Sequence, residues 1–95
     1  MTTAHESAVE FYWRPGCGFC MMLRAHLERA GLPLHEVNIW EDDDGRARVR
    51  TAANGNETVP TVFVGPVAMV NPDIDEVLAA VREHAPQLLA TRTNQ

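Results

Sequence analysis

The sequence lacks several features that would place it in other classes of protein. No apolar run approaches the roughly 18 residues of a membrane-spanning helix, and residues 1–7 lack the apolar segment of a secretory signal. No basic cluster stands out, and the formal net charge is −5. We therefore expect a cytoplasmic protein that binds neither a membrane nor nucleic acid.

Cysteine is also scarce, since the chain has only two. A structural disulfide is more typical of secreted chains. A zinc site needs two more ligands, and none of the four histidines shows the His-x3-5-His spacing of a zinc module. The consecutive acids Glu41–Asp44 do not converge on one point, so we predict no metal site. Redox chemistry is favoured, with a metal-binding or inert role as the alternative.

The two cysteines form the segment Cys17-Gly18-Phe19-Cys20, between an apolar stretch and a helical pattern. The first cysteine thus lies at a helix start, where backbone N–H groups have no partner within the helix. Those donors and the helix dipole favour a thiolate there. Cys20 lies almost one turn further on, close enough to resolve a mixed disulfide on Cys17. We expect Cys17 to be the exposed, reactive thiol and Cys20 the shielded one.

Hydrophobic patterning and turn residues predict an alternation of strands and helices over a single domain, 1–95, with its core at about 8–86. An α/β fold of order β-α-β-α-β-β-α follows, in which a four-stranded mixed sheet carries three helices on both faces. Strands are predicted at 8–13, 34–39, 58–64 and 67–70. Helices are predicted at 18–30, from Glu41 to the Asn54–Asn56 turn, and from Asn71 to Pro86.

Three local expectations accompany these elements. The three- and four-residue spacing of apolar side chains predicts the first helix, at Phe19, Met22, Leu23, Leu27 and Ala30. Asn71 followed by Pro72 is typical of an N-cap and first helical residue, so Asn71 is predicted to cap the last helix. Trp40 is expected to pack at the sheet edge.

A second segment, Thr58-Val59-Pro60, opens the third strand. Together with the Cys-x-x-Cys segment and the element order, it resembles the thioredoxin superfamily, and most closely its glutaredoxin branch. The resemblance implies a cis Val59-Pro60 bond facing the nucleophile and a Val59 backbone that pairs with the substrate. Arg14-Pro15 is similar to the basic residue and proline before the site in many glutaredoxins, so Arg14 and Thr58 join the implied thiol-binding residues.

The resemblance is incomplete where glutaredoxins carry Gly-Gly before the last helix. Here Val70-Asn71 stands in that place, and Asp73 alone occupies the position of the acidic residue. Asn71 and Asp73 are therefore the expected thiol-binding residues in this segment, which is similar to mycoredoxins, relatives that use mycothiol.

The position before the nucleophile is Gly16, where relatives often have an aromatic residue. Its small size is expected to leave Cys17 more open. Trp13 and Phe19 are the expected walls of the site.

The resemblance implies a monomeric thiol–disulfide oxidoreductase without a bound cofactor. Its reducing co-substrate would be mycothiol or glutathione, and its partners would be mixed-disulfide proteins. Two alternatives remain: a [2Fe–2S] carrier built from two chains, and an electron donor recycled by a flavin disulfide reductase.

Overall fold

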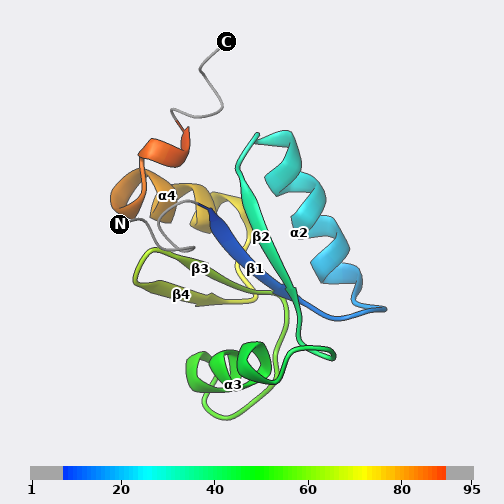
Figure 1. Cartoon of the computed structure of the whole chain (residues 1–95). Coiled ribbons are helices and arrows are strands. Elements are labelled where there is room, and N and C mark those ends of the chain that lie inside the picture. Colours follow the sequence, from blue (N-terminus) through cyan, green and yellow to red (C-terminus); the bar gives the residue numbers. More distant parts are fainter. Residues whose placement is uncertain (1–7, 90–95) are drawn as a thin grey trace.

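A four-stranded sheet in the order β2-β1-β3-β4 lies at the centre of the protein, in a computed structural model that describes residues 8–89 (Figure 1). β1 (Val9–Trp13) runs parallel to β2 (Leu34–Asn38) and antiparallel to β3 (Thr61–Val64). β3 and β4 (Val67–Val70) form an antiparallel hairpin. The predicted mixed sheet and element order are confirmed.

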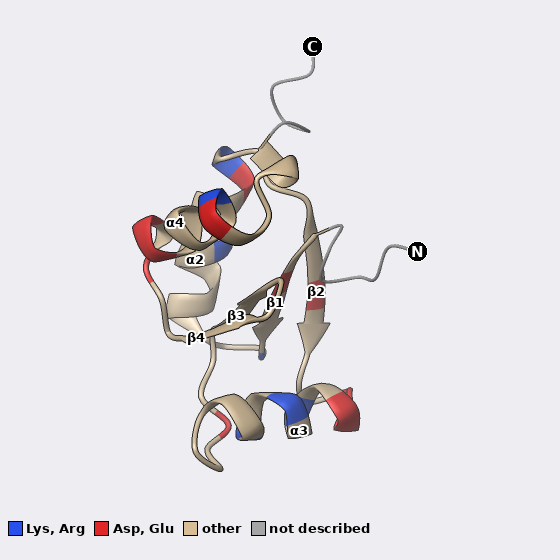
Figure 2. Ribbon diagram, turned by 90° about the vertical axis from the view of Figure 1, so that its left-hand side faces the viewer, with Lys and Arg blue, Asp and Glu red and all other residues tan. Residues whose placement is uncertain are grey.

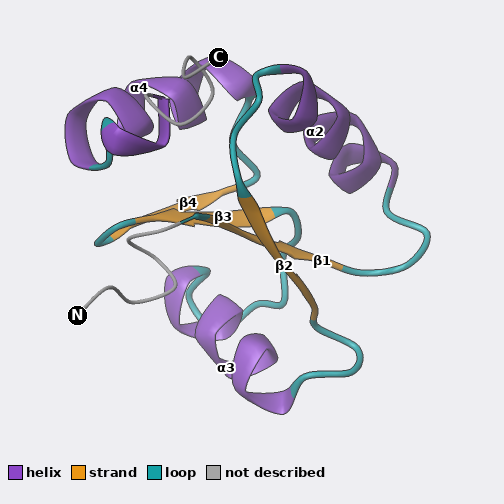
Figure 3. Cartoon of the chain, turned by 45° about the horizontal axis from the view of Figure 1, so that its top comes forward, coloured by secondary structure: helices purple, strands orange, loops and turns teal. Residues whose placement is uncertain are grey.

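Helices cover both faces of this sheet (Figure 3). α2 (Gly18–Arg29) and α4 (Ile74–His84) lie on one face, and α3 (Asp43–Ala52) lies on the other. Successive strand residues point to opposite faces, so Phe11 joins the α2/α4 core while Tyr12 joins the α3 core. Both cysteines belong to the α2/α4 core.

A glycine in α3 (Asp43–Ala52) allows this helix to lie close to the sheet. Asp42 caps the helix by accepting the Gly45 N–H at 2.7 Å, and acids at its start and arginines further along suit the helix dipole (Figure 2). A Cβ atom on Gly45 would lie only 2.6 Å from Val37 Cγ1. The absence of a side chain at residue 45 therefore lets α3 approach β2.

The predicted boundaries differ most from the structure at the starts of β3 and α4. The third strand starts at Thr61 rather than Thr58, since Pro60 has no N–H to donate to the ladder. The cap of α4 is Asp73, not Asn71, because the Asp73 carboxylate accepts the Glu76 N–H and the Glu76 carboxylate accepts the Asp73 N–H. Asn71 instead has a positive φ of 51°. This shift changes what the Asn71 side chain is free to contact.

Among residues 8–89, no helix combines the length and apolar character needed to span a membrane.

Candidate functional site

The two cysteines meet at the start of α2, where Cys17 is the N-cap residue. Its Sγ accepts the Cys20 N–H at 3.2 Å, so the helix start directs a backbone donor at this sulfur. Cys17 is 6% exposed and Cys20 is 1% exposed. The expectation of an exposed Cys17 is wrong, because the side chain packs within the α2/α4 core and beside the Val59 carbonyl. Cys20 is still the more shielded of the two.

Burial dominates the electrostatics of Cys20. Desolvation, with a smaller contribution from its hydrogen bond to Cys17, raises the pKa of the Cys20 thiol to about 12. A backbone hydrogen bond with Arg14 and the positive charge of that residue act in the opposite direction. Cys20 is therefore a neutral thiol at physiological pH in this arrangement.

The loop before β3 faces Cys17. The Val59-Pro60 bond is cis, which confirms the sequence-based expectation. Cys17 Sγ donates toward the Val59 carbonyl at 3.8 Å, and the Pro60 carbonyl accepts the Asn71 N–H at 2.7 Å. The Thr58 carbonyl accepts the Thr61 hydroxyl at 2.7 Å. These contacts link Cys17, the proline loop and the start of the last helical region.

A hollow of about 240 Å³ opens between α2 and the segment that leads into α4. This α2–α4 hollow is lined by Phe19, Met22, Leu23, His26, Asn71, Pro72, Asp73 and Ile74. It brings together three of the residues predicted for the site: Phe19, Asn71 and Asp73.

The apolar residues of α2 divide between the α2–α4 hollow and the core. Phe19 and Met22 are 66% and 60% exposed, whereas Cys20, Leu23 and Leu27 are buried. Met22 and His26 were missed as site residues. Their three- and seven-residue spacing from Phe19 was the available signal, since it places all three on one side of α2.

Three backbone donors near this hollow are already in use. The N–H groups of Asn71, Asp73 and Glu76 donate within the chain, as described above, and Pro72 has none. The Asp73 carboxylate also serves as the α4 cap. The Asn71 side chain, by contrast, is not used as the helix cap.

The lining of the α2–α4 hollow does not include Arg14, Trp13 or Trp40. The Arg14 guanidinium carbon lies 5.9 Å from the Trp40 ring centroid. Trp40 is 59% exposed, so the expectation of a ring packed at the sheet edge is wrong. Trp13 packs against the core that contains both cysteines. The Arg24 guanidinium carbon lies 4.9 Å from the centroid of the Trp13 ring.

Within the part of the chain that the structure describes, no group of three or more His, Cys, Asp or Glu side chains is placed to hold a metal ion.

Comparison with known proteins connects this geometry to one family. The glutaredoxin family model matches residues 9–69. A probable glutaredoxin of Synechocystis sp. is 33% identical over 61 residues, which cover 64% of this chain and 69% of the relative.

Solved structures agree on the fold. Glutaredoxin C1 of Populus tremula x tremuloides, in its holo form, has a TM-score of 0.61 at 24% identity, covering 96% of this chain and 84% of that one. A buckwheat glutaredoxin–glutathione complex has a TM-score of 0.59 at 22% identity, covering 94% and 80% respectively. The architecture is therefore the thioredoxin-like fold of glutaredoxins.

Proposed function

Because the chain belongs to the glutaredoxin family and is a thiol–disulfide oxidoreductase, we propose that Cys17 is its attacking thiol and Cys20 its resolving thiol. The observation that carries this assignment is the position of Cys17 as the N-cap of α2, with the Cys20 N–H donating to its sulfur at 3.2 Å. A donor directed at Sγ stabilises negative charge on that atom. The buried Cys20 thiol, with its raised pKa, suits the later step.

The proposed reaction consists of two exchanges. The Cys17 thiolate attacks one sulfur of a substrate disulfide, a Cys17–substrate bond forms, and the other substrate sulfur leaves as a thiolate that takes up a proton. Cys20 then loses its proton and attacks Cys17 Sγ, which releases the second substrate thiol. The substrate gains two electrons and the protein keeps a Cys17–Cys20 disulfide. Two low-molecular-weight thiols reduce that disulfide and are themselves oxidised.

The proline loop is proposed to align the substrate. The Val59 carbonyl lies beside Cys17 Sγ, so an extended substrate paired with the Val59 backbone would present its disulfide to that sulfur. Thr58 and Pro60 fix this segment, and Arg14 supplies a positive charge near the dithiol.

For the co-substrate, we propose a sugar-based thiol such as mycothiol in preference to glutathione. A carboxylate is well held by free backbone N–H groups at a helix start. Fewer such donors are free here, because those of Asn71, Asp73 and Glu76 are already donating and Pro72 has none. Asn71, whose amide is not used as the helix cap, and Asp73 both line the α2–α4 hollow. An amide and a carboxylate match the hydroxyl groups of a sugar. Glutathione is the natural comparison, since a buckwheat neighbour is a glutathione complex.

The experiment separates the two parts of this proposal. Cys20→Ser protein, which needs only one attacking sulfur, is assayed with mycothiol and glutathione mixed disulfides of the same peptide, and Cys17→Ser serves as the inactive control. We expect faster turnover of the mycothiol substrate and a selective loss of that preference in Asn71→Ala. Equal turnover of both substrates would overturn the thiol preference. Activity in Cys17→Ser would overturn the assignment of the nucleophile.

A further inference from the structure

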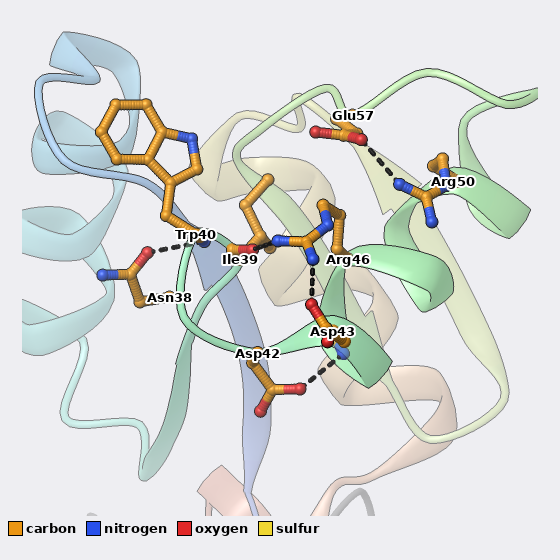
Figure 4. A network of polar contacts seen from close by, with 9 residues as sticks. Asn38, Ile39, Trp40, Asp42, Asp43, Arg46, Arg50 and Glu57 are labelled. Atoms are coloured by element: carbon orange, nitrogen blue, oxygen red, sulfur yellow. Dashed lines mark hydrogen bonds and ion pairs between the residues drawn. The ribbon is translucent and has the colours of Figure 1, made fainter.

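Trp40 combines an exposed ring with a firmly held backbone. The ring is 59% exposed, yet the Trp40 N–H donates to Asn38 Oδ1 at 2.9 Å. Arg46 Nη1 donates to the Ile39 carbonyl at 2.6 Å, and the Arg46 side chain also pairs with Asp43. Figure 4 shows this network on one side of the turn and the Trp40 ring pointing away from α3. The network fixes the turn that carries the ring, although the ring itself buries little apolar surface.

The partner of this ring is Arg14, in the loop that leads to Cys17. The guanidinium carbon lies 5.9 Å from the ring centroid, and Arg14 Nη1 donates to the Pro15 carbonyl at 3.0 Å. A Cβ atom on Gly16 would lie 3.9 Å from the same Nη1. The guanidinium is thus held alongside the loop that precedes the dithiol.

Arg14 differs from four other arginines of the chain in the group that contacts its guanidinium. Arg24, Arg46, Arg48 and Arg50 each pair with a carboxylate, whereas within residues 8–89 no carboxylate lies within ion-pair distance of Arg14. A carboxylate partner would fix the side chain but cancel much of its electrostatic field. An aromatic face attracts the cation without neutralising it.

We propose that Trp40 is a positioning residue for thiol–disulfide exchange, whose ring holds the Arg14 guanidinium alongside the loop that precedes the dithiol, with its positive charge intact. The role concerns the step that regenerates the reduced protein. A thiolate attacks Cys17 Sγ of the Cys17–Cys20 disulfide, a new bond forms to Cys17, and the electron pair of the broken S–S bond remains on Cys20. That sulfur carries a negative charge until it takes up a proton, and a positive charge nearby lowers the barrier to its departure.

The test uses the oxidised full-length protein and 2-mercaptoethanol, a thiol without ionised groups other than its sulfur. With this thiol, Arg14 cannot act by attracting a substrate carboxylate. We expect Trp40→Leu and Arg14→Gln each to slow reduction of the internal disulfide by about two- to fivefold, the factor that corresponds to an exposed cation–π contact. Trp40→Phe, which keeps an aromatic face, should retain most of the rate. Arg82→Gln, on exposed α4 surface, controls for loss of a positive charge elsewhere.

The double variant decides the mechanism. If Trp40 acts through Arg14, then Trp40→Leu has no further effect in the Arg14→Gln background. Additive effects would overturn the proposal, because Trp40 would then act independently of Arg14. An unchanged rate in Trp40→Leu, or an equal loss in Trp40→Phe and Trp40→Leu, would also overturn it. Urea unfolding of each variant verifies that the rates refer to folded protein.

Discussion

Cys20 provides a quantitative test of the site, because its environment should suppress its reactivity when it is the only thiol. In Cys17→Ser protein, Cys20 remains 1% exposed in the wild-type geometry, and burial raises its pKa to about 12. At pH 7 a thiol with this pKa has a thiolate fraction on the order of 10⁻⁵, against about 3% for an ordinary cysteine of pKa about 8.5. Ionisation alone therefore predicts a rate about three thousandfold lower than in an unfolded chain.

Part of this effect belongs to the wild-type neighbour, since the hydrogen bond and charge of Cys17 also raise the pKa of Cys20. For Cys17→Ser we therefore expect at least about hundredfold protection from iodoacetamide at pH 7, relative to the same protein in urea.

The pH profile separates ionisation from simple burial. Thiolate alkylation should continue to rise about tenfold per pH unit above pH 9, where the rate of the unfolded protein has levelled off. A native rate within tenfold of the unfolded rate, or a native rate that levels off near pH 9, would refute the reasoning.

Two further predictions concern the α3 side of the sheet. Tyr12 is the single tyrosine, and burial with its hydrogen bond to Glu10 raises its pKa to about 12. The native state therefore favours the neutral phenol, whose contribution to stability is complete below pH 10 and is lost as the pH rises toward 12. Absorbance at 295 nm should show native phenolate only above pH 11, and a titration midpoint near pH 10 would contradict the buried contact. Gly45→Ala should lower the free energy of unfolding by about 1–3 kcal/mol through overpacking, because the added Cβ would contact Val37. Gly18→Ala is the control in the same urea titration: its added Cβ has no neighbouring atom within 4 Å, so stability should not fall.

Much of the fold could be predicted from the sequence because its local signals agree with its tertiary structure. Strand Val67–Val70 has the predicted bounds, since Gly65-Pro66 and Asn71-Pro72 interrupt pairing on either side. The helix after the cysteines ends as predicted before Gly31, which has a φ of 75°.

The errors arose where several local signals compete or where distant segments meet. Asn71 and Asp73 both suit an N-cap, and the reciprocal bonds with Glu76 decide in favour of Asp73. Helical spacing groups Met22 with the core residues of α2, but only the position of the α4 segment shows that Met22 borders the hollow. The pairing of Trp40 with Arg14 depends on the sheet bringing the end of β2 beside the end of β1, which no local pattern in the sequence reveals.

The most direct test of the central claim is to identify which cysteine of the reduced wild-type protein reacts first. The protein is treated with limiting iodoacetamide at pH 7, and fragment-ion mass spectrometry locates the modified residue. We predict modification at Cys17 at least about tenfold in excess over Cys20, because a backbone N–H at the α2 start donates to Cys17 Sγ while burial keeps Cys20 protonated. Equal modification of the two cysteines, or preferential modification of Cys20, would contradict it.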